Sequence, residues 1–281
     1  MSLLKLYLNM DPHLIEKAAD IIINSHHAIA LTGAGISTES GIPDFRSPGG
    51  IWERYDPMIF FFDRFISHPE NVWRSFIEMF SAGDLPLWDA KPNRGHEALS
   101  ILEHAGLIKT VITQNIDNLH QKAGSRNVID FHGNMLFAKC MSCSKKIWYK
   151  EVVEQVSRVV PPVCSCGGLL KPDAVLFGEP IPAEAMRKSI DEAEACDLML
   201  VVGTSAQVEP AASLPLIAKG MHSSSRRLGG FNACIKECRI IEINREPTSL
   251  TERVSDFIIQ GSTGLILQSI IERIKKLKRI K

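Results

Sequence analysis

Residues 32–46, TGAGISTESGIPDFR, directly follow the apolar run 28–31, AIAL. An apolar run that ends in a glycine-rich turn is typical of a buried parallel strand whose turn brings the backbone close to a phosphate. The dinucleotide fingerprint of hydride-transfer enzymes needs a third glycine three positions after Gly35, where this chain has Thr38. It also needs an acidic residue at the end of a second strand, and no strand pattern surrounds Glu53. The stretch therefore predicts pyrophosphate binding, but not in an ordinary dehydrogenase.

The composition is typical of a globular chain in which positive and negative charges balance. The chain has 281 residues, of which 45% are hydrophobic, and 32 basic residues balance 32 acidic residues. A chain of this size can bury a large core in one domain or two. Its formal net charge of zero at pH 7 provides no overall field that would attract nucleic acid or a membrane surface. The basic groups near the C-terminus read as a solvated helix end: Arg273, Lys275, Lys276, Lys278, Arg279 and Lys281.

The N-terminus and the hydropathy pattern predict a soluble, cytoplasmic protein. Residues 1–10 lack the apolar core and the cleavage site of a secretory signal, and Asp11-Pro12 follow directly. No apolar run is long enough to span a bilayer. We therefore expect neither a membrane partner nor direct binding to nucleic acid.

Four of the seven cysteines form two closely spaced pairs, Cys140-x-x-Cys143 and Cys164-x-Cys166. Two thiolate pairs on tight turns are typical of a structural, tetrahedral zinc site. The second pair has one intervening residue where two are usual, but Gly167-Gly168 follow and let the backbone fold around a metal. We predict one structural zinc ion on these four cysteines, with unmetallated thiols as the alternative. We expect no disulfide framework, and the remaining cysteines read as core or loop residues: Cys196, Cys234 and Cys238.

The hydrophobic pattern alternates between helices and short buried strands. Apolar spacing predicts helices over 11–25, 93–104 and 262–277, with Asn93 as the N-cap of the second. Near-continuous Val/Ile/Leu runs are typical of strands covered on both faces. These runs occupy residues 28–31, 107–113, 128–131, 198–202, 239–243 and 257–259. The order predicts an α/β fold with a Rossmann-like parallel sheet.

Two segments interrupt this alternation and predict a smaller second domain. Residues 43–92 are rich in aromatic side chains and read as a helical module, and residues 135–172 hold the four paired cysteines. We expect one folded unit over 1–281, with the large Rossmann-like domain formed by residues 1–42, 93–134 and 173–281. Within the helical module, the run Phe60-Phe61-Phe62 reads as packing, with a role in lining a ligand pocket as the alternative. The polar stretch 221–230 reads as a surface loop.

Polar groups follow four of the expected strands, where an open parallel sheet binds its ligands. Amides, hydroxyls and a carboxylate collect there and predict one crevice suited to an adenine nucleotide with two riboses. These groups are Gly33-Ala34-Gly35, Gln114-Asn115-Ile116-Asp117, Gly203-Thr204-Ser205 and Asn244.

In order and spacing, these motifs resemble the sirtuin family over about residues 20–271. The resemblance rests on residues 33–37, 41–46 and 113–117, His132-Gly133, the four cysteines, Phe177-Gly178-Glu179 and residues 203–205. It implies an NAD-dependent protein lysine deacylase, with NAD as cosubstrate and one structural Zn²⁺. It also implies a large Rossmann-like domain and a small domain built from a helical and a zinc module. Its partners would be acylated-lysine proteins or peptides.

The resemblance implies a reaction in which the nicotinamide–ribose bond of NAD is broken and the acyl oxygen attacks the ribose C1′. Its products are nicotinamide, O-acyl-ADP-ribose and free lysine. His132 would be the catalytic general base, since an imidazole has a pKa near the working pH. Asp117 and Ile116 would hold the nicotinamide amide, and Asn115 and Gln114 would contact the nicotinamide ribose.

The same resemblance implies a wider set of cofactor-binding residues. Phe45 would cover the reacting face, while Asp44 and Arg46 would fix that loop and the phosphates. The full set is Gly33, Ala34, Gly35, Ser37, Asp44, Phe45, Arg46, Gln114, Asn115, Ile116, Asp117, Gly203, Thr204, Ser205, Asn244 and Ser262.

Residues 175–179 would offer a strand edge to an extended peptide substrate, through Val175, Phe177, Gly178 and Glu179. Sirtuins that prefer succinyl or malonyl lysine carry a Tyr and an Arg three residues apart in the helical module. Aligned through Val72-Trp73, those positions hold Phe76 and Met79, which cannot pair with a carboxylate. We therefore expect acetyl or a longer apolar acyl group.

Two other function classes stay open. The same activated ribose could react with a protein nucleophile or with water, which would make the chain a mono-ADP-ribosyltransferase or an NAD hydrolase. A non-catalytic nucleotide-sensing module is the third class. The presence of Gln114, Asn115, Asp117 and His132 together argues against it. His96 and His120 read as structural histidines.

Overall fold

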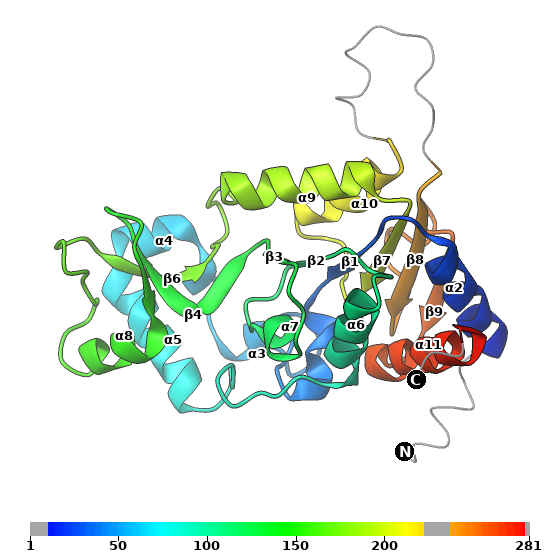
Figure 1. The fold of residues 1–281 in the computed structure, drawn as a ribbon. Helices are drawn as coiled ribbons and strands as arrows, with labels where there is room; N and C mark the ends of the chain where they lie inside the picture. The colour runs from blue at the N-terminus through cyan, green and yellow to red at the C-terminus, as the bar shows by residue number, and fades with distance from the viewer. Residues whose placement is uncertain (1–10, 222–236, 279–281) are drawn as a thin grey trace, which may run out of the picture.

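The computed structural model describes residues 11–221 and 237–278, and its larger sheet has six parallel strands (Figure 1). Their order is β3-β2-β1-β7-β8-β9, so the chain runs outward from β1 in one direction and from β7 in the other. The switch point, where such sheets bind ligands, therefore lies between β1 and β7. The strands are β1 (Ala28–Thr32), β2 (Thr110–Thr113), β3 (Val128–Asp130), β7 (Leu198–Val202), β8 (Arg239–Asn244) and β9 (Phe257–Gln260). The predicted Rossmann-like sheet is confirmed.

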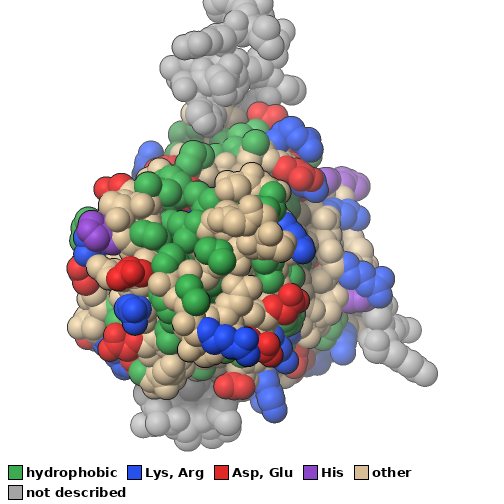
Figure 2. Space-filling model, turned by 90° about the vertical axis from the view of Figure 1, so that its left-hand side faces the viewer, with side chains coloured by type: hydrophobic (Ala, Val, Ile, Leu, Met, Phe, Trp, Pro, Cys, Tyr) green, Lys and Arg blue, Asp and Glu red, His purple; other side chains and the backbone are tan. Residues whose placement is uncertain are grey.

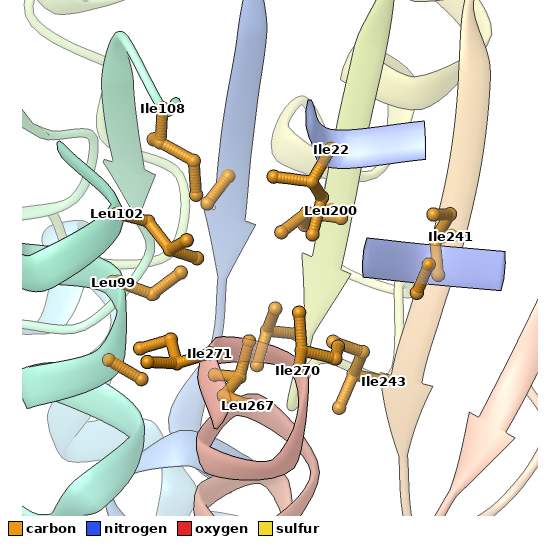
Figure 3. Packing of buried hydrophobic residues seen from close by; sticks show 14 of the residues in the cluster. Ile22, Leu99, Leu102, Ile108, Leu200, Ile241, Ile243, Leu267, Ile270 and Ile271 are labelled. Carbon is orange, nitrogen blue, oxygen red and sulfur yellow. The ribbon is translucent and has the colours of Figure 1, made fainter. Parts of the chain in front are cut away.

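Helices cover both faces of this sheet, which explains the near-continuous apolar strands. On one face lie α2 (Pro12–Asn24), α6 (Arg94–His104) and α11 (Thr263–Lys278). Figure 3 shows Ile22, Leu99 and Ile270 of these helices packed around Leu200 and Ile241 of the strands. The opposite face is covered by α9 (Ala183–Ala195), the 3-10 helix η4 (Ala211–Ser213) and α10 (Leu214–Ala218).

The two interrupting segments share a separate hydrophobic core. Three antiparallel strands, β4 (Gly133–Cys140), β5 (Lys146–Trp148) and β6 (Leu170–Ala174), pair in the order β5-β4-β6. Their core includes Phe65, Trp73 and Tyr149, and the Trp73 indole donates to the Leu170 carbonyl at 2.8 Å. The helices of this part are α3 (Ile51–Arg54), η3 (Pro57–Phe60), α4 (Phe62–Ser67), α5 (Pro69–Ser81) and α8 (Tyr149–Val156). This separate core supports the two-domain division, which we retain as a proposal with the boundaries given above.

Most of the predicted elements of the large sheet are confirmed within one or two residues, including Asn93 as the N-cap of α6. β2 is shorter than predicted because Leu107 and Ile108 donate their N–H groups to the Leu102 carbonyl and complete the end of α6. Of the polar stretch 221–230, only Met221 lies among the described residues. In the basic C-terminal stretch, Arg273 pairs with Glu16 of α2, and residues 279–281 lie outside the described part.

Figure 2 shows the end of the molecule near α4, α8 and β6, where apolar side chains gather in the middle and charged groups surround them. Larger exposed apolar side chains in and beside these elements include Ile66, Val153 and Val159. Within residues 11–221 and 237–278, no helix combines the length and apolar character needed to cross a membrane.

Candidate active site

A cavity of about 980 Å³ opens at the carboxyl ends of the parallel strands. Its wall is built from the loops after β1, β2, β7 and β8 and from the segment after β6. Ser262 stands outside this wall, which includes its neighbour Thr263 instead. The predicted residues on the wall are Gly33, Ala34, Gly35, Ser37, Asp44, Phe45, Arg46, Gln114, Asn115, Ile116, Asp117, His132, Val175, Phe177, Gly178, Glu179, Gly203, Thr204, Ser205 and Asn244.

The glycine turns after β1 and β7 pack directly against each other. The Gly33 N–H donates to the Val202 carbonyl at 3.0 Å, and the Gly35 N–H donates to the Gly203 carbonyl at 2.7 Å. A Cβ on Gly33 would lie 2.7 Å from the Thr204 Cβ, and a Cβ on Gly35 would lie 2.8 Å from the Gly203 oxygen. Glycine is therefore required here for close approach of two backbones.

Replacing Gly203 with alanine is expected to destabilise the fold by about 3 kcal/mol. Gly203 has a φ of +61°, and its added Cβ would lie 2.4 Å from the Ile36 nitrogen. Gly83→Ala is the matched control, because Gly83 also has a positive φ, +74°, but no atom within 4 Å of its added Cβ. Thermal unfolding should show a clearly larger loss for Gly203→Ala, and equal losses would contradict the packing argument.

A buried polar network fixes the loops after β1 and β2. The Ser37 hydroxyl donates to Asp117 Oδ2 at 2.6 Å, and Asn115 Nδ2 donates to Ser37 Oγ at 3.0 Å. The Leu119 N–H donates to the other Asp117 oxygen at 2.9 Å. Burial raises the pKa of Asp117, and these donors partly oppose the rise. The carboxyl group is thus held rigidly on the cavity wall.

Two buried histidines lie behind this network. His96 Nε2 is 3.4 Å from Ser37 Oγ, and the His120 ring stands 4.9 Å from the His96 ring. His120 Nε2 is 2.9 Å from the Thr32 hydroxyl of β1. Burial lowers the pKa of His96 to about 4 and also lowers the pKa of His120. Both rings are therefore neutral near pH 7 and serve as buried supports.

His132 follows β3 and has one ring nitrogen committed to the protein. Its Nδ1 lies 3.1 Å from the Gln114 carbonyl oxygen, which can only accept, so Nδ1 carries the proton and donates. The Nε2 atom has no hydrogen-bond partner among the described residues, and His132 lines the cavity. Burial lowers the pKa of His132, with a smaller opposite effect from the Gln114 carbonyl. The side chain is a neutral imidazole with an available lone pair.

The loop after residue 43 is held to the segment after β7. The Asp44 carboxylate accepts from the N–H groups of Arg46 and Ser47 at 2.9 and 2.7 Å, which closes a tight turn. Burial opposes ionisation of Asp44, but the Ser47 hydroxyl and these N–H donors lower its pKa overall. Arg46 donates to Gln207 at 2.6 Å and to Ser205 at 3.3 Å. A guanidinium group is thus fixed beside the glycine turns.

Aromatic side chains close the other end of the cavity. The Phe45 ring meets the Phe60 ring edge to face, with centroids 5.7 Å apart, and Phe60 meets Phe76 at 5.8 Å. Phe60 and Phe76 belong to the smaller core and also line the cavity. Of the run Phe60-Phe61-Phe62, the cavity wall includes only Phe60 within the described residues. The alternative lining role therefore applies to Phe60.

The segment after β6 is anchored between His132 and the helical module. The Val175 N–H donates to the His132 carbonyl at 2.8 Å. The Phe177 N–H donates to the Phe60 carbonyl, and the Phe177 carbonyl accepts from the Phe62 N–H. The backbone groups of Gly178 have no hydrogen-bond partner among the described residues. Because Val175 and Phe177 already use backbone groups in these bonds, the segment presents fewer free N–H and C=O groups than a bare strand edge.

The Sγ atoms of Cys140, Cys143, Cys164 and Cys166 all lie within 4.8 Å of one another. Zinc–sulfur bonds of 2.3 Å in a tetrahedron place the sulfurs about 3.8 Å apart. The Cys143–Cys164 and Cys140–Cys166 separations are 3.8 and 3.5 Å. A Cβ on Gly168 would lie 2.7 Å from Cys140 Sγ, so glycine lets the second turn close around the cluster. Four thiolate donors fill a tetrahedral shell, and the cluster fits one structural zinc ion.

Glu39 helps to hold the loop after β1 in place, a role that sequence motifs alone do not reveal. Its carboxylate accepts from the Ser262 hydroxyl at 2.8 Å and from the Gly264 N–H at 3.0 Å, and thereby joins the loop after β1 to the start of α11. A Cβ on Gly264 would lie 2.6 Å from this carboxylate. Ser262 thus supports the cavity through Glu39 rather than from its wall.

The Sir2 family model matches residues 33–210 of this chain. The chain belongs to the Sir2 family. The NAD-dependent protein deacylase 2 of Pyrobaculum aerophilum is 42% identical over 260 residues, which cover 92% of this chain and 95% of that protein. The resemblance to sirtuins is confirmed.

Solved Sir2 structures share the fold of this Sir2-family chain. A Sir2 complex with a p53 peptide and NAD⁺ has a TM-score of 0.78 and 35% identity, covering 95% of this chain and 99% of that one. A Sir2 variant with a deacetylated p53 peptide and 3′-O-acetyl ADP-ribose has a TM-score of 0.78 and 37% identity. The match covers 92% of this chain and 97% of that one.

Proposed function

We propose that this chain removes acyl groups from protein lysine side chains in an NAD-dependent reaction. The observation that carries the proposal is the His132 imidazole on the cavity wall, with Nδ1 donating to Gln114 and Nε2 available. Relatives named NAD-dependent protein deacylase or deacetylase support it. So does the Sir2 structure that holds both a deacetylated peptide and an acetylated ADP-ribose.

The cavity walls suit a dinucleotide on steric and polar grounds. The turns at Gly33, Gly35 and Gly203 bring bare backbone to the switch point, and Arg46 places a cation beside them. We assign the phosphates to these turns and the ribose hydroxyls to the Gln114 and Asn115 amides. The other predicted cofactor residues on the wall keep the roles given above as proposals.

NAD, when bound, supplies an electrophilic ribose carbon through loss of nicotinamide. The residues of this chain would then have three tasks. Asp117, held by Ser37 and the Leu119 N–H, would orient the nicotinamide amide. Phe45 would exclude water from the reacting face. His132 would accept a proton at Nε2, because Nδ1 is already protonated and fixed by the Gln114 carbonyl.

The proposal is tested by incubating the purified protein with an acetyl-lysine peptide, with and without NAD. Mass spectrometry should show free lysine peptide, nicotinamide and O-acetyl-ADP-ribose only when NAD is present. ADP-ribose without peptide deacetylation would identify an NAD hydrolase. ADP-ribose attached to protein would identify a transferase and would likewise overturn the proposal.

Succinyl-lysine peptides are expected to react at least about 100-fold more slowly than butyryl-lysine peptides, because a buried carboxylate without a partner costs several kcal/mol. Phe76 lines the cavity and offers no charge, and Met79 is fully buried in the smaller core. Butyryl-lysine is the matched control, since the butyryl chain is as long as the succinyl chain but is apolar. The kcat/KM ratio decides the question, and equal values would refute the apolar acyl preference.

The acid limb of the pH profile is expected below pH 6.5. Only the neutral His132 imidazole can accept a proton, and burial lowers its pKa from 6.5. The neutral form therefore persists to lower pH, and kcat/KM should fall only as the pH drops through this lowered pKa. A profile from pH 5 to 8 with its half-point above 6.5 would contradict the role assigned to His132.

We also retain the cytoplasmic location as a proposal. Fractionation of cells that express the full chain tests it.

A further inference from the structure

Cys196 and Cys238 lie side by side at the amino ends of two neighbouring strands. Cys196 is the C-cap of α9 and lies two residues before the start of β7, and Cys238 immediately precedes β8. Both side chains have 0% exposure, and their Sγ atoms are 3.5 Å apart. Neither cysteine belongs to the zinc cluster or to the cavity wall.

The backbone between these residues has the spacing that a disulfide requires. The parallel register pairs Leu198 with Arg239, which places Cys238 opposite Asp197, the neighbour of Cys196. The Arg239 N–H donates to the Asp197 carbonyl at 2.9 Å and holds the two segments together. An offset of one residue between adjacent strands gives a Cα separation of about 6 Å. Disulfides span Cα separations of about 4.4–6.8 Å.

We propose that Cys196 and Cys238 are a redox site in which the two thiols are oxidised to a disulfide with each other. The oxidant is a low-molecular-weight disulfide. One cysteine thiolate attacks the oxidant, forms a mixed disulfide and releases one small thiol. The second thiolate attacks the mixed disulfide, forms the Sγ–Sγ bond and releases the second small thiol. The two cysteine protons and two electrons end on the two small thiols. The sulfurs need to approach by about 1.5 Å, since an S–S bond is about 2.05 Å long.

The bond would stabilise the fold without altering the cavity. It would close a loop from Cys196 to Cys238 and so reduce the freedom of the unfolded chain. The cavity residues Gly203 and Asn244 stand at the opposite ends of β7 and β8, roughly 20 Å away. Because both sulfurs are buried, the oxidant acts on the unfolded or opened chain, and the folded protein shields the bond from reductants.

The test is refolding of the full chain from urea, with zinc present, in oxidised glutathione or in a phosphine reductant. Alkylation of the denatured product and peptide mapping should show Cys196 linked to Cys238 only in the oxidised sample. The oxidised sample should melt roughly 5 °C higher than the reduced sample. Its rate of NAD-dependent deacetylation at 25 °C should stay within about twofold of the reduced sample, because the cavity is at the far end of the strands.

Single cysteine variants complete the test. Cys234→Ser should keep both the link and the difference in Tm, whereas Cys238→Ser should lose both. Three outcomes would each overturn the proposal. They are a disulfide that involves Cys234, alkylation of Cys196, Cys234 and Cys238 after oxidation, and a Tm difference that persists in Cys238→Ser. If Cys238→Ser fails to fold, the peptide map of the wild-type chain still decides the pairing.

Discussion

Replacing His132 with alanine is expected to lower kcat/KM for deacetylation by at least about 100-fold while NAD binding is largely kept. A positioned general base contributes about 10²–10⁴ to the rate. The alanine variant loses the only ring nitrogen that we assign to proton transfer, whereas the glycine turns and Arg46 that we assign to the phosphates stay in place. Steady-state kinetics and calorimetric titration with NAD measure the two effects separately.

A matched control is His13→Ala, because His13 is exposed on α2 and stands outside the cavity wall. This variant should keep wild-type activity. Loss of NAD binding in His132→Ala, in proportion to its loss of activity, would instead identify His132 as a structural histidine. Wild-type turnover in that variant would contradict the general-base role altogether.

The centre of the large sheet is predictable because β1, β2 and β7 are buried at every position. Ile29 and Leu31 face the core under α9, and Ala28 and Ala30 face the core under α2 and α6. Most positions of these strands are therefore apolar, and such runs are visible in the sequence. The parallel arrangement brings the carboxyl ends of the strands to one edge. For that reason, polar residues distant in sequence could be assigned to one cavity.

The small sheet is hidden from sequence patterns because its strands carry polar residues. β6 contains Lys171, which is only 4% exposed, and Pro172. The Lys171 ammonium donates to the Pro172 and Ala174 carbonyls and pairs with Glu179 at 3.0 Å. Burial lowers the pKa of Lys171, and the Glu179 carboxylate opposes the shift. The charge is satisfied by two nearby carbonyls and by Glu179, so a lysine can be buried in this strand and no hydrophobic alternation marks it.

The contacts of Glu39 cannot be predicted from sequence patterns because they join distant parts of the chain. Its partners Ser262 and Gly264 stand more than 200 residues away in sequence and meet it only because α11 returns to the edge of the sheet. The pairing of His96 with His120 likewise depends on how α6 packs beside the loop after β2. Local motifs identify groups that touch a ligand, whereas the residues that support those groups follow from packing.

Removing the zinc site is expected to abolish deacetylation although none of its cysteines lines the cavity. In Cys164→Ala, zinc content should fall from about one to below about 0.1 per chain, and Tm should fall by more than about 10 °C. Structural zinc contributes directly to folding, and Cys140 and Cys164 are buried in the smaller core. Metal analysis, thermal unfolding and the acetyl-peptide assay measure the three effects.

The route from the zinc cluster to the cavity runs through β4 and β6. Cys140 pairs with Leu170 across these strands, and β6 leads into Val175, whose N–H donates to the His132 carbonyl at 2.8 Å. We therefore expect loss of the metal to loosen the segment that we assign to the peptide and that contacts His132. Ser165→Ala is the control, because this exposed residue lies between two cysteine ligands and donates no metal-binding group. A zinc-free Cys164→Ala variant with wild-type Tm and activity would show that the small sheet stands without its metal.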